Sequence, residues 1–177
     1  MLFIPAGPEF DQLFHDAHTR AFHLETQDSY GQVAEEVAMM ERFLAGEPYE
    51  YPPNWDQWFQ MIKSTTARGV AVQRVRVVTE PHGDYTRFAL DYTSRFNQPS
   101  GEDIRWLPRQ SVDAAELTPD DWWLFDNDIA LFTMFTSTGD FAGGGHTTDA
   151  DIVARCVRVR DRLWERAIPH DRYVAAT

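Results

Sequence analysis

The sequence contains a single cysteine, Cys156, so no disulfide bond can form within the chain. It has no apolar run long enough to span a membrane, and its N-terminus lacks the basic and then apolar segments of a signal peptide. We therefore predict a cytoplasmic protein with no membrane partner. The 177 residues suffice for one domain with a sizeable core.

Positive charge is scarce, with 16 Lys and Arg residues against 28 Asp and Glu residues and a formal net charge of -12. A surface of this sign repels phosphate backbones, and no run of Lys or Arg offers a local exception. The sequence thus predicts that the protein does not bind nucleic acid directly. The acidity suits a protein that meets a basic partner, and it is also a common route to solubility.

Motifs for catalysis and for cofactor or metal binding are absent as well. The chain has neither a Gly-x-Ser-x-Gly elbow nor a His-Glu-x-x-His zinc motif. His15 and His18 are three residues apart but lack further ligands, and Cys156 lies on an apolar helical stripe. The loop expected over 141–146 holds three glycines without the spacing of a phosphate-binding loop, which predicts mobility. We expect no metal and no cofactor.

β-branched and aromatic residues predict three neighbouring strands, over 70–78, 102–107 and 122–132. A tight turn at 126–128 would make 122–136 a hairpin. Apolar residues at helical spacing predict helices over 8–24, 30–44, 54–69, 84–92 and 148–167. A helix between the first two strands favours parallel pairing, and the hairpin adds antiparallel pairing.

The predicted fold class is therefore α/β, a mixed sheet covered by helices. We expect one domain over 1–177, with an N-terminal helical segment over 1–48 and an α/β core over 49–177.

Arginines gather on two of the predicted strands. Arg74 and Arg76 are two residues apart and face the same side, and Arg105 lies in the next strand. Forked guanidinium donors match carboxylate or phosphate groups, so they can clamp an anionic ligand. The other interpretation is a structural ion network with Glu25, Glu102 or Asp126. We favour the network, because buried charges need partners whether or not a ligand exists.

Carboxylates and aromatic residues provide the other candidate site residues. Glu25 and Asp28 lie in a polar connector and can act as a general acid and base, or as helix caps. Tyr30 ends this connector. Trp122 and Trp123 are adjacent in a strand and face opposite sides, so one of them can line a pocket; we choose Trp122.

Five segments together resemble an actinobacterial family of unknown function. They are Phe10-x-x-Leu13-Phe14, Ala21-x-His23-Leu24-Glu25-x-x-Asp28-x-Tyr30, Arg74-Val75-Arg76-Val77-Val78, Gly101-Glu102-Asp103-Ile104-Arg105 and Asp121-Trp122-Trp123-Leu124-Phe125-Asp126. Members of that family often lie beside genes for Xre-type helix-turn-helix regulators. The resemblance therefore implies a regulatory or signalling role.

The order of the predicted elements is also similar to one half of a phospholipase D-like domain. Active members of that superfamily carry His-x-Lys on the strand before an Asp, whereas the corresponding stretch here, 120–126, has neither residue. The resemblance implies a catalytically silent sensor or interaction domain, of a kind that commonly pairs two halves. We accordingly expect a homodimer or a heteromeric complex.

Our main functional hypothesis is a non-enzymatic cytoplasmic regulatory protein that binds a helix-turn-helix partner, a small anionic ligand, or both. The alternative is an enzyme acting on an anionic small molecule, with Glu25, Asp28 and Asp126 as acid or base. Arg74, Arg76, Arg105, Tyr30 and Trp122 would then hold the ligand. We also predict that Arg105 pairs with Asp126.

Overall fold

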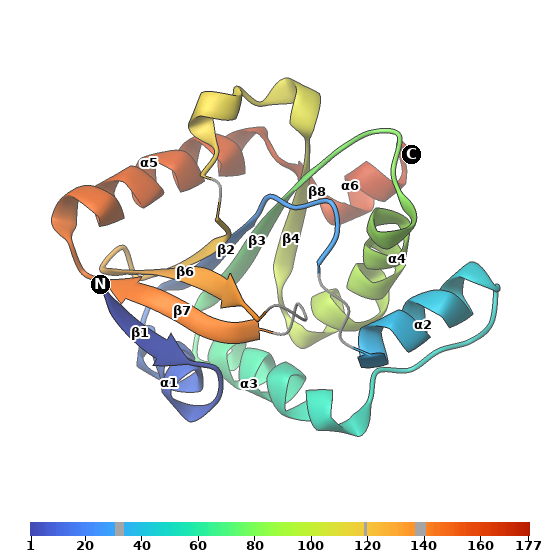
Figure 1. Ribbon diagram of the computed structural model, residues 1–177, viewed down its shortest axis with the longest axis horizontal. Coiled ribbons are helices and arrows are strands. Elements are labelled where there is room, and N and C mark those ends of the chain that lie inside the picture. Colours follow the sequence, from blue (N-terminus) through green and yellow to red (C-terminus); the bar gives the residue numbers. More distant parts are fainter. Residues whose placement is uncertain (31–33, 119, 137–140) are drawn as a thin grey trace.

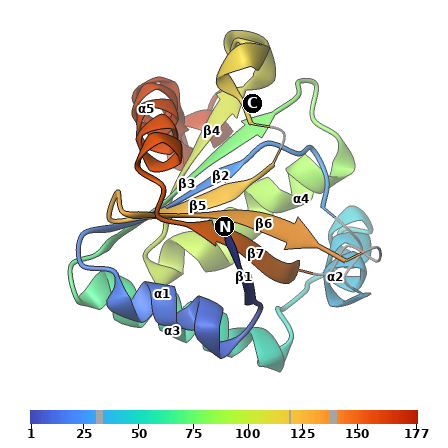
Figure 2. The same cartoon turned by 60° about the vertical axis from the view of Figure 1, so that its left-hand side comes forward.

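The computed structural model describes residues 1–30, 34–118, 120–136 and 141–177. It forms three layers, one sheet with helices on both faces (Figure 1, Figure 2). The strands are β1 (Leu2–Pro5), β2 (Arg20–Glu25), β3 (Ala71–Val78), β4 (Asp103–Pro108), β5 (Trp122–Phe125), β6 (Ile129–Phe135), β7 (Phe141–Thr147) and β8 (Ile168–Pro169). The α-helices are α1 (Pro8–Asp16), α2 (Ala34–Leu44), α3 (Asp56–Ala67), α4 (Asp84–Tyr92), α5 (Ala150–Arg166) and α6 (His170–Val174).

The sheet has the strand order β1-β7-β6-β5-β2-β3-β4-β8. Strands β2, β3 and β4 are parallel neighbours, and the other neighbouring pairs are antiparallel. The parallel pairs follow from the connections: α2 and α3 lie between β2 and β3, and α4 lies between β3 and β4. The predicted mixed α/β sheet is confirmed.

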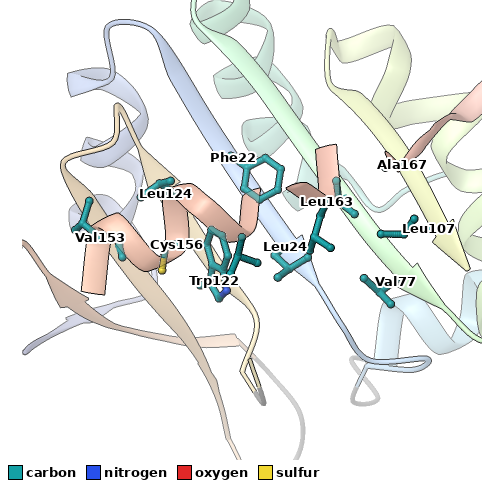
Figure 3. Packing of buried hydrophobic residues seen from close by; sticks show 13 residues of the cluster. Phe22, Leu24, Val77, Leu107, Trp122, Leu124, Val153, Cys156, Leu163 and Ala167 are labelled. Atoms are coloured by element: carbon teal, nitrogen blue, oxygen red, sulfur yellow. The ribbon is translucent and has the colours of Figure 1, made fainter. Parts of the chain in front are cut away.

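Helix α5 covers one face of the sheet (Figure 2), and Val112 and Leu117, from the segment between β4 and β5, pack against the same cluster. The apolar residues of α5 recur every three or four positions and end in the fully buried Leu163. They pack on inward residues of β2, β3 and β5, among them Phe22, Val77 and Trp122 (Figure 3). This cluster is a continuous apolar core.

The opposite face is covered by several shorter helices. Near the amino ends of β2 and β3, α1 and α3 bury apolar residues such as Phe14 and Ile62 against the sheet. Near β4, α4 and α6 contribute Ala89 and Tyr173 to a smaller cluster. The cover on this face is therefore divided, and the candidate site lies between its parts.

Most of the predicted elements are present. Strands β3 and β4, the β5–β6 hairpin and helices α3, α4 and α5 lie where the sequence predicts them. The hairpin turns at Asp126 and Asn127, which have φ angles of 51° and 68°, in the left-handed region that Asp and Asn tolerate. The helix expected over 30–44 is present as α2, and its residues 31–33 lie outside the described part of the chain.

The helix predicted over 8–24 is wrong in its second half. Helix α1 ends at Asp16, Ala17 is already extended, and Arg20–Glu25 forms β2 between β5 and β3. The segment expected to be helical thus contributes β1 and β2 to the sheet, besides α1 and α2. The sequence misleads because β2 is buried on both faces, so its residues lack a clear alternation of apolar and polar.

The mobile loop predicted over 141–146 is also wrong, since these residues form β7 between β1 and β6. A Cβ atom at Gly143, where φ is 128°, would lie 2.1 Å from the Ile4 carbonyl oxygen. One at Gly144 would lie 2.2 Å from Leu131 Cδ2. The glycines therefore allow close contact with neighbouring strands, which composition alone does not reveal.

Candidate functional site

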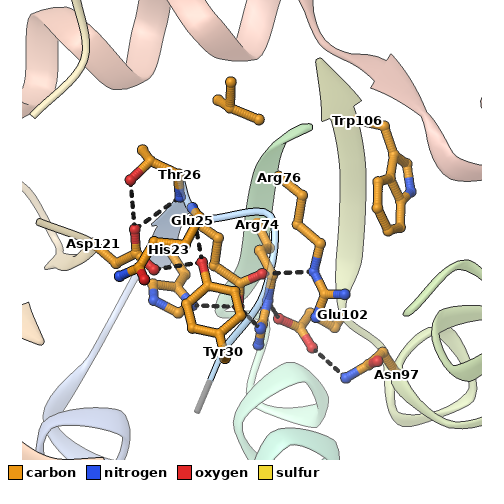
Figure 4. A network of polar contacts seen from close by, with 12 residues as sticks. His23, Glu25, Thr26, Tyr30, Arg74, Arg76, Asn97, Glu102, Trp106 and Asp121 are labelled. Carbon is orange, nitrogen blue, oxygen red and sulfur yellow. Dashed lines mark hydrogen bonds and ion pairs between the residues drawn. The ribbon is translucent and has the colours of Figure 1, made fainter. Parts of the chain in front are cut away.

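Alternation along β2 and β3 brings four polar side chains to the face opposite α5. His23 and Glu25 of β2 lie directly beside Arg74 and Arg76 of β3 in the parallel register. The residues between them point toward α5 and are apolar, so the charge is confined to one face. Figure 4 shows the four side chains converging near the carboxyl ends of the two strands.

A buried ion network joins these strands to β4. The Arg74 guanidinium donates one hydrogen bond to Glu25 Oε1 and another, of 2.7 Å, to Glu102 Oε1. Arg76 Nε lies 2.6 Å from Glu25 Oε2 in an ion pair that lacks the geometry of a hydrogen bond. Asn97 donates to the second oxygen of Glu102 over 3.1 Å. Two guanidiniums thus balance two carboxylates.

The network fixes the charge of its members. Burial raises the pKa of Glu25, but the coulombic fields of Arg74 and Arg76 outweigh this effect and lower it to about 2. Burial lowers the pKa of Arg74, but Glu102 and Glu25 raise it above its ordinary value. For His23, burial and the nearby Arg74 hold the pKa well below 6.5, so the ring is neutral. Glu25 is therefore an ionised partner of arginine and a poor proton donor.

Two further carboxyl groups face the same region, and neither accepts a hydrogen bond from a cationic side chain among the described residues. Asp121 accepts from Tyr30 Oη at 2.5 Å and from the backbone and hydroxyl of Thr26 at 2.8 Å each. Glu36 accepts from Tyr85 Oη at 3.1 Å. Burial is the main cause that raises the pKa of both carboxyl groups.

These groups line a cavity of about 480 Å³. Its wall includes a chain of neighbouring aromatic rings with centroids 5.0–6.4 Å apart, running through Phe10, Phe141, Phe135, Tyr30 and Tyr85. Further lining comes from Trp55, Trp58, Tyr92 and Trp123. The cavity thus combines an aromatic wall with a polar base that holds the ion network and the two tyrosine-bonded carboxyl groups.

Unused hydrogen-bonding atoms remain at this base. The His23 ring stacks on Trp123 with centroids 4.2 Å apart, and neither of its nitrogens has a hydrogen-bond partner among the described residues. The Oδ1 atom of Asn97 likewise has none within those residues. His23 is 8 % exposed and Asn97 is 4 % exposed, although buried polar groups are normally hydrogen-bonded. The base therefore has free capacity for a ligand or for water.

The structure brings four of the predicted site residues together. Glu25, Tyr30, Arg74 and Arg76 all line the cavity. Trp122 does not: it is fully buried on the α5 face, and its neighbour Trp123 lines the cavity instead. The choice between these adjacent residues depended on which face of the sheet carries the site.

Asp28 and Asp126 have other partners. Asp28 accepts from the backbone and the hydroxyl of Thr79, at 2.7 Å each, and ties the carboxyl ends of β2 and β3 together. Asp126 accepts from three successive backbone N–H groups, at His18, Thr19 and Arg20. Burial raises the pKa of each carboxyl, but these hydrogen bonds outweigh it and lower the pKa below its ordinary value.

The predicted pair of Arg105 and Asp126 is wrong. The Arg105 guanidinium lies 3.8 Å from the ring centroid of Trp164 on α5, and 3.5 Å from Asp103. It also donates to the Trp164 carbonyl oxygen over 3.3 Å. Strands β2 and β3 separate β4 from β5, so Asp126 follows a strand that is not a neighbour of β4.

Sequence reasoning missed four residues of the site, His23, Glu36, Asp121 and Trp123, whereas it named Glu102 as a partner of the arginines. A usable signal was present for His23, which is two residues from Glu25 and shares its face once Arg20–Glu25 is recognised as a strand. Glu36 and Asp121 come from two other segments, and only the tertiary structure brings them here.

Among the described residues, no group of three or more His, Cys, Asp or Glu side chains could hold a metal ion. No helix in the same part of the chain is long and apolar enough to cross a membrane.

The family model for a domain of unknown function, DUF6879, matches residues 8–175. The chain belongs to this family. Among curated proteins, none matches the sequence. The predicted likeness to a family of unknown function is confirmed to that extent.

Two solved structures are similar in fold. Nuc from Salmonella typhimurium, a phospholipase D family member, has a TM-score of 0.51 and 13% identity; the match covers 90% of this chain and 87% of that one. TrmBL2, an archaeal chromatin protein, has a TM-score of 0.46 and 12% identity; the match covers 89% of this chain but 48% of that one. The chain thus spans about half the length of TrmBL2. The likeness to Nuc supports the expected phospholipase D-like fold.

The prediction about partners requires a correction. It excluded nucleic acid on the basis of net charge, yet the structure of TrmBL2, one of the two similar proteins, is described as showing a novel mode of DNA binding. We therefore withdraw the exclusion. At this identity the likeness assigns no DNA binding to the present chain. The comparisons support none of the predicted partners, and we do not retain the helix-turn-helix regulator, the anionic ligand or the homodimer.

Proposed function

We propose that this domain binds a small organic molecule in the aromatic-walled cavity and that it acts as a sensor, without catalysis. The observation that carries the proposal is a cavity of about 480 Å³, at whose base buried atoms of His23 and Asn97 lack a hydrogen-bond partner among the described residues. Cavities with a mainly apolar wall and a few placed polar groups are typical ligand sites.

The non-catalytic part of the proposal rests on how the charged groups are engaged. Glu25 has a pKa of about 2 because of its two arginines, so it cannot donate a proton near neutral pH. Asp28 and Asp126 do not line the cavity and are bonded to backbone and hydroxyl groups. The alternative hypothesis, an enzyme that uses these three carboxylates, therefore has less support.

A regulatory role in the cytoplasm agrees with a sensor. It depends on the resemblance to actinobacterial proteins encoded beside Xre-type regulators, and it stays a prediction.

Ligand-observed NMR with a library of small aromatic and aliphatic compounds tests the binding proposal. We expect hits that raise the melting temperature and whose binding is lost in Trp58→Ala and in Trp55→Ala, two changes to the cavity wall. Trp164→Ala is the matched control, because Trp164 packs on the α5 face. An absence of hits, or hits that bind both cavity variants unchanged, would contradict the proposal.

A further inference from the structure

The charges around the cavity do not balance once the ion network has been counted. Arg74 and Arg76 are matched by Glu25 and Glu102, which lie within 2.7 Å of their guanidinium nitrogens. His23 is neutral and contributes no positive charge. Beyond this set, the charged groups that line the cavity are two carboxyl groups, and no cation among the described lining residues forms an ion pair with either of them.

The two extra carboxyl groups are Glu36 and Asp121, and each is held by a tyrosine hydroxyl. The rings of these tyrosines, Tyr30 and Tyr85, lie 5.8 Å apart, so the two pairs are neighbours on one wall. Burial is the main cause that raises the pKa of both carboxyl groups; the field of Arg76 lowers the pKa of Glu36 but does not outweigh the loss of water. A cation placed between them would offset this cost.

The rest of the lining also suits positive charge. Aromatic faces attract cations through their quadrupole, and the chain from Phe10 to Tyr85 supplies several such faces around one space. The Asn97 side-chain oxygen, which has no hydrogen-bond partner in the described part of the chain, and the unprotonated nitrogen of the neutral His23 ring are hydrogen-bond acceptors. Both kinds of group favour a donor with positive charge.

Resting on the function proposed above, we propose that the cavity binds a small organic cation, a protonated amine or quaternary ammonium group carried on an apolar body. The charged head lies toward Asp121 and Glu36, and the apolar body lies against the tryptophan-rich part of the wall. The expected anionic ligand would have to displace Glu25 from Arg76, the guanidinium with the fewest protein partners in the network.

Three probes of similar shape test this inference: 2-phenylethylammonium, 2-phenylethanol and phenylacetate. Isothermal calorimetry at neutral pH should give the tightest binding for the ammonium probe, about tenfold tighter than for the alcohol, and the weakest for the carboxylate. Tetramethylammonium should compete with the ammonium probe, because it shares only the positive charge.

Charge-removing variants locate the binding group. Asp121→Asn and Glu36→Gln should each weaken the ammonium probe about tenfold and leave the alcohol nearly unchanged. Glu165→Gln is the matched control, since Glu165 is exposed on α5, across the sheet from the cavity. Circular dichroism checks that each variant folds. If one of them does not, the variant of the other carboxylate still tests the inference.

Several results would overturn the inference. Phenylacetate binding as tightly as the ammonium probe would place the anion at Arg76. Equal affinity for all three probes, or no effect of either charge variant, would leave a cavity without charge selectivity; in that case the proposed ligand-binding function stands while the cation is wrong. Binding of none of the three probes would reject the cation, and the library screen would then decide the broader proposal separately.

Discussion

The two faces of β2 and β3 differ in kind although they belong to the same strands. Toward α5, side chains such as Leu24 and Val75 form a continuous apolar cluster with one long helix. Toward α1, α3 and α4, the intervening Glu25 and Arg74 form an ion network beside a cavity. The comparison teaches that a sheet interior can hold charge where one strand's carboxylate lies in register with its neighbour's guanidinium.

The covering helices explain why the aromatic-walled cavity lies on the face opposite α5. Helix α5 runs over 17 residues and presents an unbroken apolar stripe to the sheet. The other cover consists of separate clusters around α1 with α3, α4 with α6, and α2 with α4. These clusters do not merge. The space between them therefore holds the polar side chains of the ion network and the cavity.

The largest loss of stability is expected when one arginine of the ion network is removed. Arg74→Met leaves Glu25 and Glu102 with one guanidinium between them, and we expect a loss of about 4 kcal/mol in the free energy of unfolding. Urea unfolding followed by tryptophan fluorescence measures it.

The double variant Arg74→Met with Glu102→Leu serves as the control, because it removes a buried pair together and keeps Glu25 beside Arg76. It should be more stable than Arg74→Met alone. A double variant that is weaker by the sum of both single losses would argue against a coupled network.

A fall in pH should weaken the ion network of Glu25 and not the apolar cluster beneath α5. The pKa of Glu25 is 4.5 in the unfolded chain and about 2 in the folded one, so its stabilising effect is complete above 4.5 and is lost as the pH falls toward 2. The expected loss is on the order of 3 kcal/mol. The raised pKa values of Asp121 and Glu36 act in the opposite direction, so the comparison is made with a variant.

Glu25→Gln should have a flatter stability curve between pH 4.5 and 2 than the unaltered protein, measured by urea unfolding at each pH. Parallel curves for the two proteins would show that Glu25 does not carry this dependence.

Truncating a buried side chain beneath α5 should lower the free energy of unfolding and leave the candidate site unchanged. Leu163→Ala removes a fully buried side chain from the α5 cluster, with an expected loss of about 3 kcal/mol. The loss should be the same at pH 7 and pH 4, and the affinity for a cavity ligand should not change. Thermal and urea unfolding with calorimetry check both points; altered ligand affinity would mean that the two faces are coupled.

The smallest effect is expected at the partly exposed edge of the apolar face. Arg105→Ala removes a guanidinium that stacks on Trp164 and whose side chain is 25% exposed, so we expect a loss of about 1 kcal/mol. Combined with Asp126→Asn, the losses should add, since the two residues share no partner. Strong non-additivity in unfolding measurements would restore the pair that the structure rejects.

Much of the sheet could be predicted from local patterns. The run from Val70 to Val78 is rich in valine, which is β-branched, and it follows Gly69. In α5, buried apolar residues recur at regular spacing as far as Leu163. β2 could not be predicted in this way, because Phe22 and Leu24 pack under α5 while the polar residues beside them are buried on the other face. The partners that make those polar residues tolerable lie about 50 to 100 residues away.

The sequence by itself determined which residues alternate on each strand, and therefore that Arg74 and Arg76 share a face. Only the tertiary structure decided what that face meets. Parallel pairing of β2 with β3 sets Glu25 beside Arg76, and the loop before β5 brings Asp121 to Tyr30. These contacts depend on strand order and long-range closure, which local propensity does not encode. They place Arg74 and Arg76 in a structural ion network, the interpretation that the sequence favoured over an anion clamp.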